Sequence, residues 1–155
     1  EVVSIASTMS SDQEVLAAAV LHDTVEDTPV TLEEIASTFS PRVAHMVDIE
    51  SDCLDGAGKL SWRERKARSM ARIAAADRDS QIVALSDKLA NMRAIARDYR
   101  IEGDALWRIF REKERSAHEW HYRTLASSLK NLSGTVAYEE FVSLVEEVFP
   151  NENNN

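Results

Sequence analysis

The stretch from Asp79 to Tyr99 reads DSQIVALSDKLANMRAIARDY and has the apolar spacing of a helix. Asp87 and Asn91 lie four residues apart in this stretch, so a helix places them on the same side. The pattern predicts a helix that is otherwise largely apolar on the side that carries these two polar groups. An alternative is an ordinary amphipathic helix in which Asp87 pairs with Lys88 or Arg93 at the surface. The apolar positions are Ile82, Val83, Leu85, Leu89, Met92, Ile95 and Ala96.

Helix start signals recur through the rest of the chain. Three capping boxes are present, at Ser11 with Glu14, Thr31 with Glu34 and Ser61 with Glu64. Together with Ser40-Pro41, where proline suits the first helical position, they predict helices ending near residues 25, 39, 51 and 76. Further helices are expected over 103–132 and 137–149, with a turn at 55–58. Because no segment alternates convincingly with period two, the sequence predicts a single all-α domain over 1–150 and a polar tail over 151–155.

Composition excludes several classes of protein. The longest apolar run, residues 16–21, is far shorter than the roughly 20 residues that span a bilayer. The single Cys53 excludes an internal disulfide and a multi-cysteine zinc site. A net charge of −9 argues against sequence-independent binding of nucleic acid, which needs a basic face. We therefore expect a soluble, cytoplasmic protein that binds neither membrane nor nucleic acid.

The chain opens on an apolar helical pattern, EVVSIA, without an initiator Met or an N-cap residue. Helices rarely begin in this way. We expect that residues precede Glu1 in the protein.

Ionisable residues gather at the end of the first long apolar segment, where residues 21–29 read LHDTVEDTP. On a helix, His22 and Glu26 lie four residues apart, as do Asp23 and Asp27. Acidic residues near a helix C-terminus are unfavourable with the helix dipole, and imidazole with carboxylates suits Mn²⁺, Fe²⁺ or Zn²⁺. A metal site is one interpretation of this cluster. The other is a helix end capped by His22 and followed by a solvated acidic turn.

Taken together, LHDTVEDT at 21–28 and LSDKLANMR at 85–93 resemble the HD superfamily, and more specifically the hydrolase domain of the RelA/SpoT family and its small stand-alone relatives. The resemblance covers roughly Glu1 to Arg97. It implies an HD-type helical bundle, here with additional C-terminal helices, that holds one divalent ion, usually Mn²⁺, by two His and two Asp. His22, Asp23 and Asp87 match three of these ligands, and the fourth, a His, is expected upstream of Glu1.

The resemblance also implies roles for other residues. Glu26 and Asp27 match the pair that orients and deprotonates the attacking water, and Asn91 matches a contact to the ribose region of the nucleotide. Arg65 and Lys66 resemble a basic pair that meets phosphates, although a solvated helix face explains them equally well. Ala94 departs from the family, where Thr is usual, and this puts the identity of the substrate in doubt.

The function that these residues predict is metal-dependent hydrolysis of a nucleotide, with a guanosine polyphosphate cleaved at its 3′-pyrophosphate as the leading substrate. The alternatives are another nucleotide, such as a deoxynucleotide monophosphate or NADPH, and a degenerate HD domain that binds without turnover. A homodimer is compatible with the C-terminal helices. Other candidates are interpreted as structural: His118 and His121 as packing residues, His45 as a core-edge residue, Trp62 and Trp107 as core or rim aromatics, and the acidic segment 48–52 as solvated.

Overall fold

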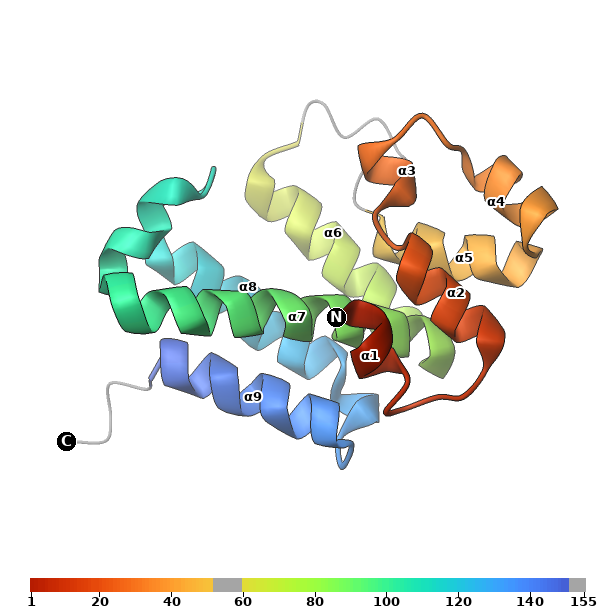
Figure 1. The fold of residues 1–155 in the computed structure, drawn as a ribbon. Helices are drawn as coiled ribbons and strands as arrows, with labels where there is room; N and C mark the ends of the chain where they lie inside the picture. Colours follow the sequence, from red (N-terminus) through yellow and green to blue (C-terminus); the bar gives the residue numbers. More distant parts are fainter. Residues whose placement is uncertain (52–59, 151–155) are drawn as a thin grey trace.

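The computed structural model describes residues 1–51 and 60–150, and this part of the chain is helical with no strand (Figure 1). The all-α prediction is therefore confirmed. Cys53, the turn expected at 55–58 and the tail at 151–155 lie outside the described residues. The helices are α1 (Val2–Ala6), α2 (Gln13–Leu21), α3 (Thr24–Asp27), α4 (Leu32–Thr38), α5 (Pro41–Glu50), α6 (Trp62–Ala75), α7 (Arg78–Glu102), η2 (Gly103–Ile109), α8 (Arg115–Ser128), η3 (Lys130–Leu132) and α9 (Val136–Val148).

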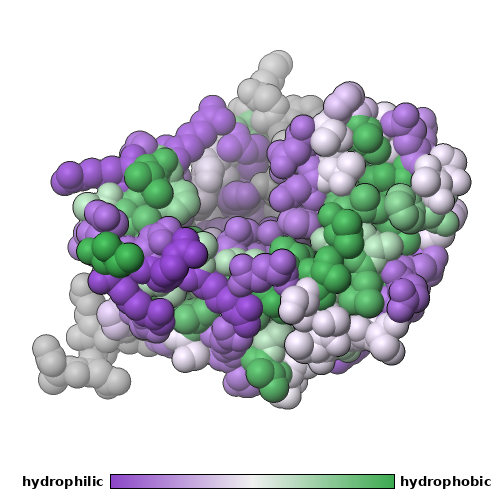
Figure 2. Space-filling model, in the orientation of Figure 1, coloured by the Kyte–Doolittle hydropathy of each residue, from purple (hydrophilic) through white to green (hydrophobic). Residues whose placement is uncertain are grey.

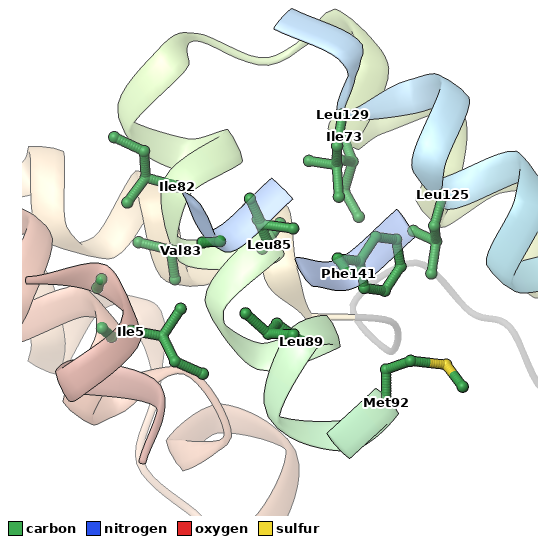
Figure 3. Close-up of a cluster of buried hydrophobic side chains, with 14 of the residues drawn as sticks. Ile5, Ile73, Ile82, Val83, Leu85, Leu89, Met92, Leu125, Leu129 and Phe141 are labelled. Carbon is green, nitrogen blue, oxygen red and sulfur yellow. The ribbon is translucent and has the colours of Figure 1, made fainter. Parts of the chain in front are cut away.

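Helix α7 is the central element, and α1, α2, α5 and α9 pack around it. Asp77 caps its start by accepting a hydrogen bond from the Ser80 amide at 2.9 Å. Its apolar face is buried, as its spacing predicts, and Figure 3 shows Leu85, Leu89 and Met92 of α7 among side chains of the surrounding helices. Because α7 is covered on several sides, a polar group in its middle lies in the interior unless it faces a gap between its neighbours.

The end of α2 differs from the prediction. Asp12, and not Ser11, caps the start of this helix, accepting a hydrogen bond from the Glu14 amide at 2.9 Å. The helix ends at Leu21 and does not continue to Val25, because Asp23 becomes the N-cap position of the separate short helix α3. The capping boxes predicted for α4 and α6 and the proline start of α5 are confirmed.

The single long helix predicted over 103–132 is wrong. Gly103 adopts a φ of 54°, which favours glycine, and ends α7. The chain then forms η2, turns, and starts again as α8. A straight helix of 30 residues would extend about 45 Å, whereas the turn folds α8 back and buries the rings of Trp107 and Tyr122 against Phe149.

Candidate metal centre

The junction of α2 and α3 meets the middle of α7 at three of the predicted residues. The His22 Nε2 atom lies 3.0 Å from Asp23 Oδ2 and 3.5 Å from Asp87 Oδ1. The side chains of His22 and Asp87 are only 16% and 11% exposed, whereas that of Asp23 is 59% exposed. Residues 64 positions apart in the sequence thus form a cluster that is buried on one side and open on the other.

The break between α2 and α3 orients the His22 ring. Its Nδ1 atom lies 2.9 Å from the carbonyl oxygen of Ala19, in the last turn of α2. A carbonyl only accepts, so Nδ1 carries the proton in the neutral ring and Nε2 keeps its lone pair toward the two carboxylates. His22 does cap the helix end, as the structural alternative proposed, and this same hydrogen bond leaves Nε2 available as a ligand.

Asp87 is held by two neighbours on its own helix. Asn91 Nδ2 donates to Asp87 Oδ1 at 3.0 Å, and Lys88 Nζ donates to Asp87 Oδ2 at 2.7 Å. Burial is the largest single influence on the pKa of Asp87 and raises it, but the Lys88 ammonium, hydrogen bonds and the nearby His22 together outweigh burial and lower that pKa below its ordinary value. Asp87 is therefore an ionised, largely buried carboxylate, and the interpretation of it as a surface residue is wrong.

Glu50, at the end of α5, is a component of this region that the sequence analysis missed. The prediction that segment 48–52 is solvated is wrong for Glu50 and Ser51, which are 6% and 1% exposed. Lys88 Nζ donates a hydrogen bond to Glu50 Oε1. Burial raises the pKa of Glu50 to about 8 despite the attraction of Lys88. The sequence does contain a signal for the burial of Glu50. This residue follows Val43 by seven residues and Val47 by three, and this spacing places it on the buried face of α5.

The other predicted site residues lie on the short helix α3 and on α6. Glu26 and Asp27 are exposed on α3, and their backbone amides donate to the Asp23 carbonyl at 3.2 and 2.9 Å. The continuous helix assumed for their spacing is therefore interrupted. Arg65 and Lys66 are half-buried on α6, where Arg65 Nη1 donates to the carbonyl of Leu60 at 3.3 Å. Direct contacts thus join His22, Asp23, Asp87 and Asn91.

The geometry of the cluster fits a divalent ion only in part. Within residues 1–51 and 60–150, no three His, Cys, Asp or Glu side chains are placed so that together they could hold a metal ion. Neighbouring ligands of an octahedral ion, each at about 2.1 Å from it, lie about 3 Å apart. The two separations from His22 Nε2, 3.0 and 3.5 Å, are of this size. One imidazole nitrogen and two carboxylate oxygens are also donors of the right chemistry.

The molecular surface on the side of α3 and α7 is divided between hydrophilic and hydrophobic residues (Figure 2). Figure 2 shows a hollow above α7 and beside α3 whose rim is mostly hydrophilic, while hydrophobic residues gather on the side of α2 and α4. No helix within the described ranges is both long and apolar enough to cross a membrane.

The other histidines are placed differently. His118 and His121 are buried among aromatic rings, as predicted, with the His118 ring stacked on Trp107 at 4.9 Å between centroids. Trp62 packs edge-on against both histidines at 5.7 Å. The side chain of His45 is 55% exposed and lies 3.5 Å from Asp77, so it is a surface residue and not part of the core edge.

Comparison with known proteins agrees with this geometry. A zebrafish (Danio rerio) protein named guanosine-3′,5′-bis(diphosphate) 3′-pyrophosphohydrolase MESH1 is 38% identical over 87 residues, which are 56% of this chain and 46% of that protein. A protein of Aquifex aeolicus named guanosine-3′,5′-bis(diphosphate) 3′-pyrophosphohydrolase is 34% identical over 110 residues, 69% of this chain and 14% of that protein. The chain thus spans less than half the length of either relative.

Two solved structures share the fold. Protein lmo0812 from Listeria monocytogenes EGD-e superimposes with a TM-score of 0.81 at 25% identity, over 97% of this chain and 92% of that one. A metazoan ortholog of SpoT, described as hydrolysing ppGpp, superimposes with a TM-score of 0.72 at 22% identity, over 94% and 76%. The family model of the HD domain matches residues 1–114, which include every residue of the cluster. The chain therefore belongs to the HD-domain family.

Proposed function

We propose that this protein hydrolyses a guanosine polyphosphate at its 3′-pyrophosphate, using one divalent ion held by His22, Asp23 and Asp87. The observation that carries the proposal is the convergence of His22 Nε2 with Asp23 Oδ2 and Asp87 Oδ1, while Nδ1 is tied to the backbone. A ring fixed in this way presents a lone pair, and not an N–H proton, to a cation.

The ion in this proposal is Mn²⁺, because the donor set is rich in oxygen. When bound, it lowers the pKa of a coordinated water and neutralises phosphoryl charge. The proposal includes a fourth ligand, the histidine expected upstream of Glu1. Arg93 follows Asp87 by six residues on α7, and its Nη1 atom lies 3.2 Å from Glu1 Oε1. Glu1 therefore lies beside α7.

The chain's own residues complete the reaction in this proposal. Glu26 and Asp27 are exposed on the turn that follows Asp23, where a carboxylate can accept a proton from the attacking water. Asn91 fixes Asp87 through its amide nitrogen and keeps its amide oxygen for a ribose hydroxyl. Arg65 and Lys66 supply positive charge for phosphate groups. A locally positive site is required because the chain carries a net charge of −9.

The choice of substrate is supported by the zebrafish and Aquifex relatives, both named for this reaction. The experiment is to incubate the protein, including any residues that precede Glu1, with Mn²⁺ and ppGpp and to measure pyrophosphate release. We expect release that depends on Mn²⁺ and is abolished in Asp87→Ala. Metal-loaded wild-type protein that leaves ppGpp intact would contradict the choice of substrate.

Ala94 favours a second candidate, the same chemistry on a different nucleotide. The residue stands where the related hydrolases usually carry Thr, and it offers no hydroxyl to a nucleotide. The measurement is a panel of nucleotides that includes a deoxynucleotide monophosphate and NADPH, with phosphate and pyrophosphate release scored separately. Release of phosphate alone from one of these compounds would favour the second candidate. Metal and nucleotide binding without any release would indicate a domain that binds without turnover.

A further inference from the structure

Glu50 is a buried acid that the proposed reaction does not use. Its side chain is 3% exposed, and its Oε2 atom has no hydrogen-bond partner among the described residues. Burying a carboxyl group is unfavourable, and apolar residues in place of a buried ion pair are often as stable or more stable. Stability alone therefore gives a weak reason for an acid at this position.

The contacts of Glu50 lead to the candidate metal centre. Glu50 Oε1 accepts a hydrogen bond from Lys88 Nζ, and the same Nζ donates to Asp87 Oδ2 at 2.7 Å. The other oxygen of that carboxylate, Oδ1, lies 3.5 Å from His22 Nε2. One ammonium thus bridges α5 and α7 and occupies the Asp87 oxygen that does not face His22.

We propose that Glu50 is a positioning residue: by anchoring Lys88 on Asp87 Oδ2, it turns Asp87 Oδ1 toward the metal. This inference rests on the proposed function, because it assigns Asp87 as a metal ligand. Ligating carboxylates are commonly hydrogen-bonded by outer residues that fix their orientation.

Lys88 needs such an anchor because of its own chemistry. Its ammonium ends a flexible four-carbon stem and has three donors, with no preferred fork geometry. Its side chain is 17% exposed, so it has an opening to solvent. With Glu50 in place, two acceptors on opposite elements hold the ammonium between them. Without Glu50, the ammonium is free to leave Asp87 or to shift onto Oδ1, where it would compete with the ion.

Hydrogen bonding, and not charge, is the property of Glu50 that this role requires. Glu50 Oε1 accepts the hydrogen bond from Lys88 Nζ, and this contact is the anchor. A glutamine keeps the acceptor oxygen without the charge, whereas a leucine removes it. Glu50→Gln is therefore the conservative replacement and Glu50→Leu the disruptive one.

The test is Mn²⁺ affinity measured by isothermal titration calorimetry on the whole protein, without substrate. We expect Glu50→Leu to weaken binding by about 10- to 100-fold, the usual cost of losing an outer-shell partner, and Glu50→Gln to stay within about threefold of wild type on the same scale. Asp48→Ala is the matched control. It lies on the same helix and breaks the 2.8 Å pair with Arg72, which is not part of this chain of contacts, so its affinity should equal wild type.

A double variant, Glu50→Leu with Lys88→Met, separates positioning from folding. Replacing both partners with apolar residues removes the unpaired buried charge, so the melting temperature should recover to about that of wild type. Mn²⁺ affinity should remain weak, because Asp87 Oδ2 then lacks its donor. A purely structural role for Glu50 predicts that both recover together.

The outcomes distinguish this inference from the function on which it rests. Wild-type affinity in Glu50→Leu, or restored affinity in the double variant, would overturn the positioning role and leave the metal centre intact. Wild-type protein that binds no Mn²⁺ would instead overturn the proposed function, and the inference with it.

Discussion

Two regions of the molecule hold partly or fully buried histidines, and the surroundings of these histidines are opposite in character. At the junction of α2, α3 and α7, His22 faces two carboxylates and its Nδ1 is tied to a carbonyl. Between α6, η2 and α8, His118 and His121 are surrounded by the rings of Trp62, Trp107 and Phe110. His118 directs its Nε2 atom at the backbone carbonyl of Glu112, 3.0 Å away.

The neighbours of a histidine, more than its burial, indicate its role. Carboxylates next to a free ring nitrogen form a set of donors that gains from a cation. Aromatic rings around an imidazole provide packing and offer a cation no oxygen ligands. The first region is therefore the candidate site. The second is a packed aromatic cluster that contributes to the core at the C-terminal helices.

The largest expected effect is the loss of the first region's chemistry. Asp87→Ala removes a proposed ligand, and pyrophosphate release should fall by more than about 100-fold, since even outer-shell changes cost about 10- to 100-fold. Calorimetry should show Mn²⁺ binding lost in parallel. Retained Mn²⁺ affinity in a folded Asp87→Ala variant would remove Asp87 from the ligand set.

The next effect separates the water-handling residues from the ligands. Glu26→Gln removes a proposed proton acceptor and should lower kcat by about 10²- to 10⁴-fold. Mn²⁺ affinity should stay at the wild-type level, because Glu26 is not a proposed ligand. If kcat is unchanged, the proton is accepted elsewhere, and the same assay on Asp27→Asn tests the other member of the pair.

A smaller effect is expected in the aromatic region. His118→Phe keeps a ring stacked on Trp107 but loses the hydrogen bond to Glu112, so the free energy of unfolding should fall by about 0.5–1.5 kcal/mol. Thermal or urea unfolding measures this change. Mn²⁺ affinity and kcat should not change. A loss of metal binding in His118→Phe would break the comparison between the two regions.

The smallest effect concerns the attachment of α9 to α7. Hydrogen bonds from Arg93 Nε and Nη2, each 2.6 Å long, lower the pKa of Glu140 below its ordinary 4.5. Its contribution to stability is therefore fully present above pH 4.5 and is lost as the pH falls through the lower folded-state pKa. Because the pair is partly exposed, Glu140→Gln should destabilise the protein by only about 0.2–1 kcal/mol at neutral pH.

Urea unfolding at a series of pH values checks this last prediction. The difference between wild type and Glu140→Gln should shrink as the pH drops below 4.5. A difference that grows on acidification would contradict the assigned pairing. The metal affinity of the variant should match wild type, because α9 supplies no residue of the site.

The sequence was sufficient to predict α7 and the grouping of His22 and Asp23 with Asp87. Apolar spacing predicts the buried face of α7, and the two motif segments indicate that residues 64 positions apart belong together. It was not sufficient for the break after Leu21, because LHDTVEDT contains no Gly and Pro29, which follows this stretch, lies well beyond the break. At the break, His22 Nδ1 lies 2.9 Å from the Ala19 carbonyl oxygen and Asp23 takes the N-cap position of α3.

Tertiary contacts explain the other failures. Glu50 lies on the periodic apolar face of α5, yet its acidic neighbours suggested a solvated segment. Its burial depends on Lys88, 38 residues further along the chain. The 103–132 region is predicted as one helix but divides into η2, α8 and η3, and the rings of Trp107 and Tyr122 pack on Phe149 in this arrangement.

A crystal structure of the protein grown with Mn²⁺, with the ion located by anomalous scattering, tests whether His22, Asp23 and Asp87 hold a metal ion. We expect one strong peak within about 2.0–2.2 Å of His22 Nε2 and Asp87 Oδ1, with Asp23 completing that side. A Mn²⁺-saturated crystal with no peak between α2, α3 and α7, or with its peak beside His118 and His121, would contradict it.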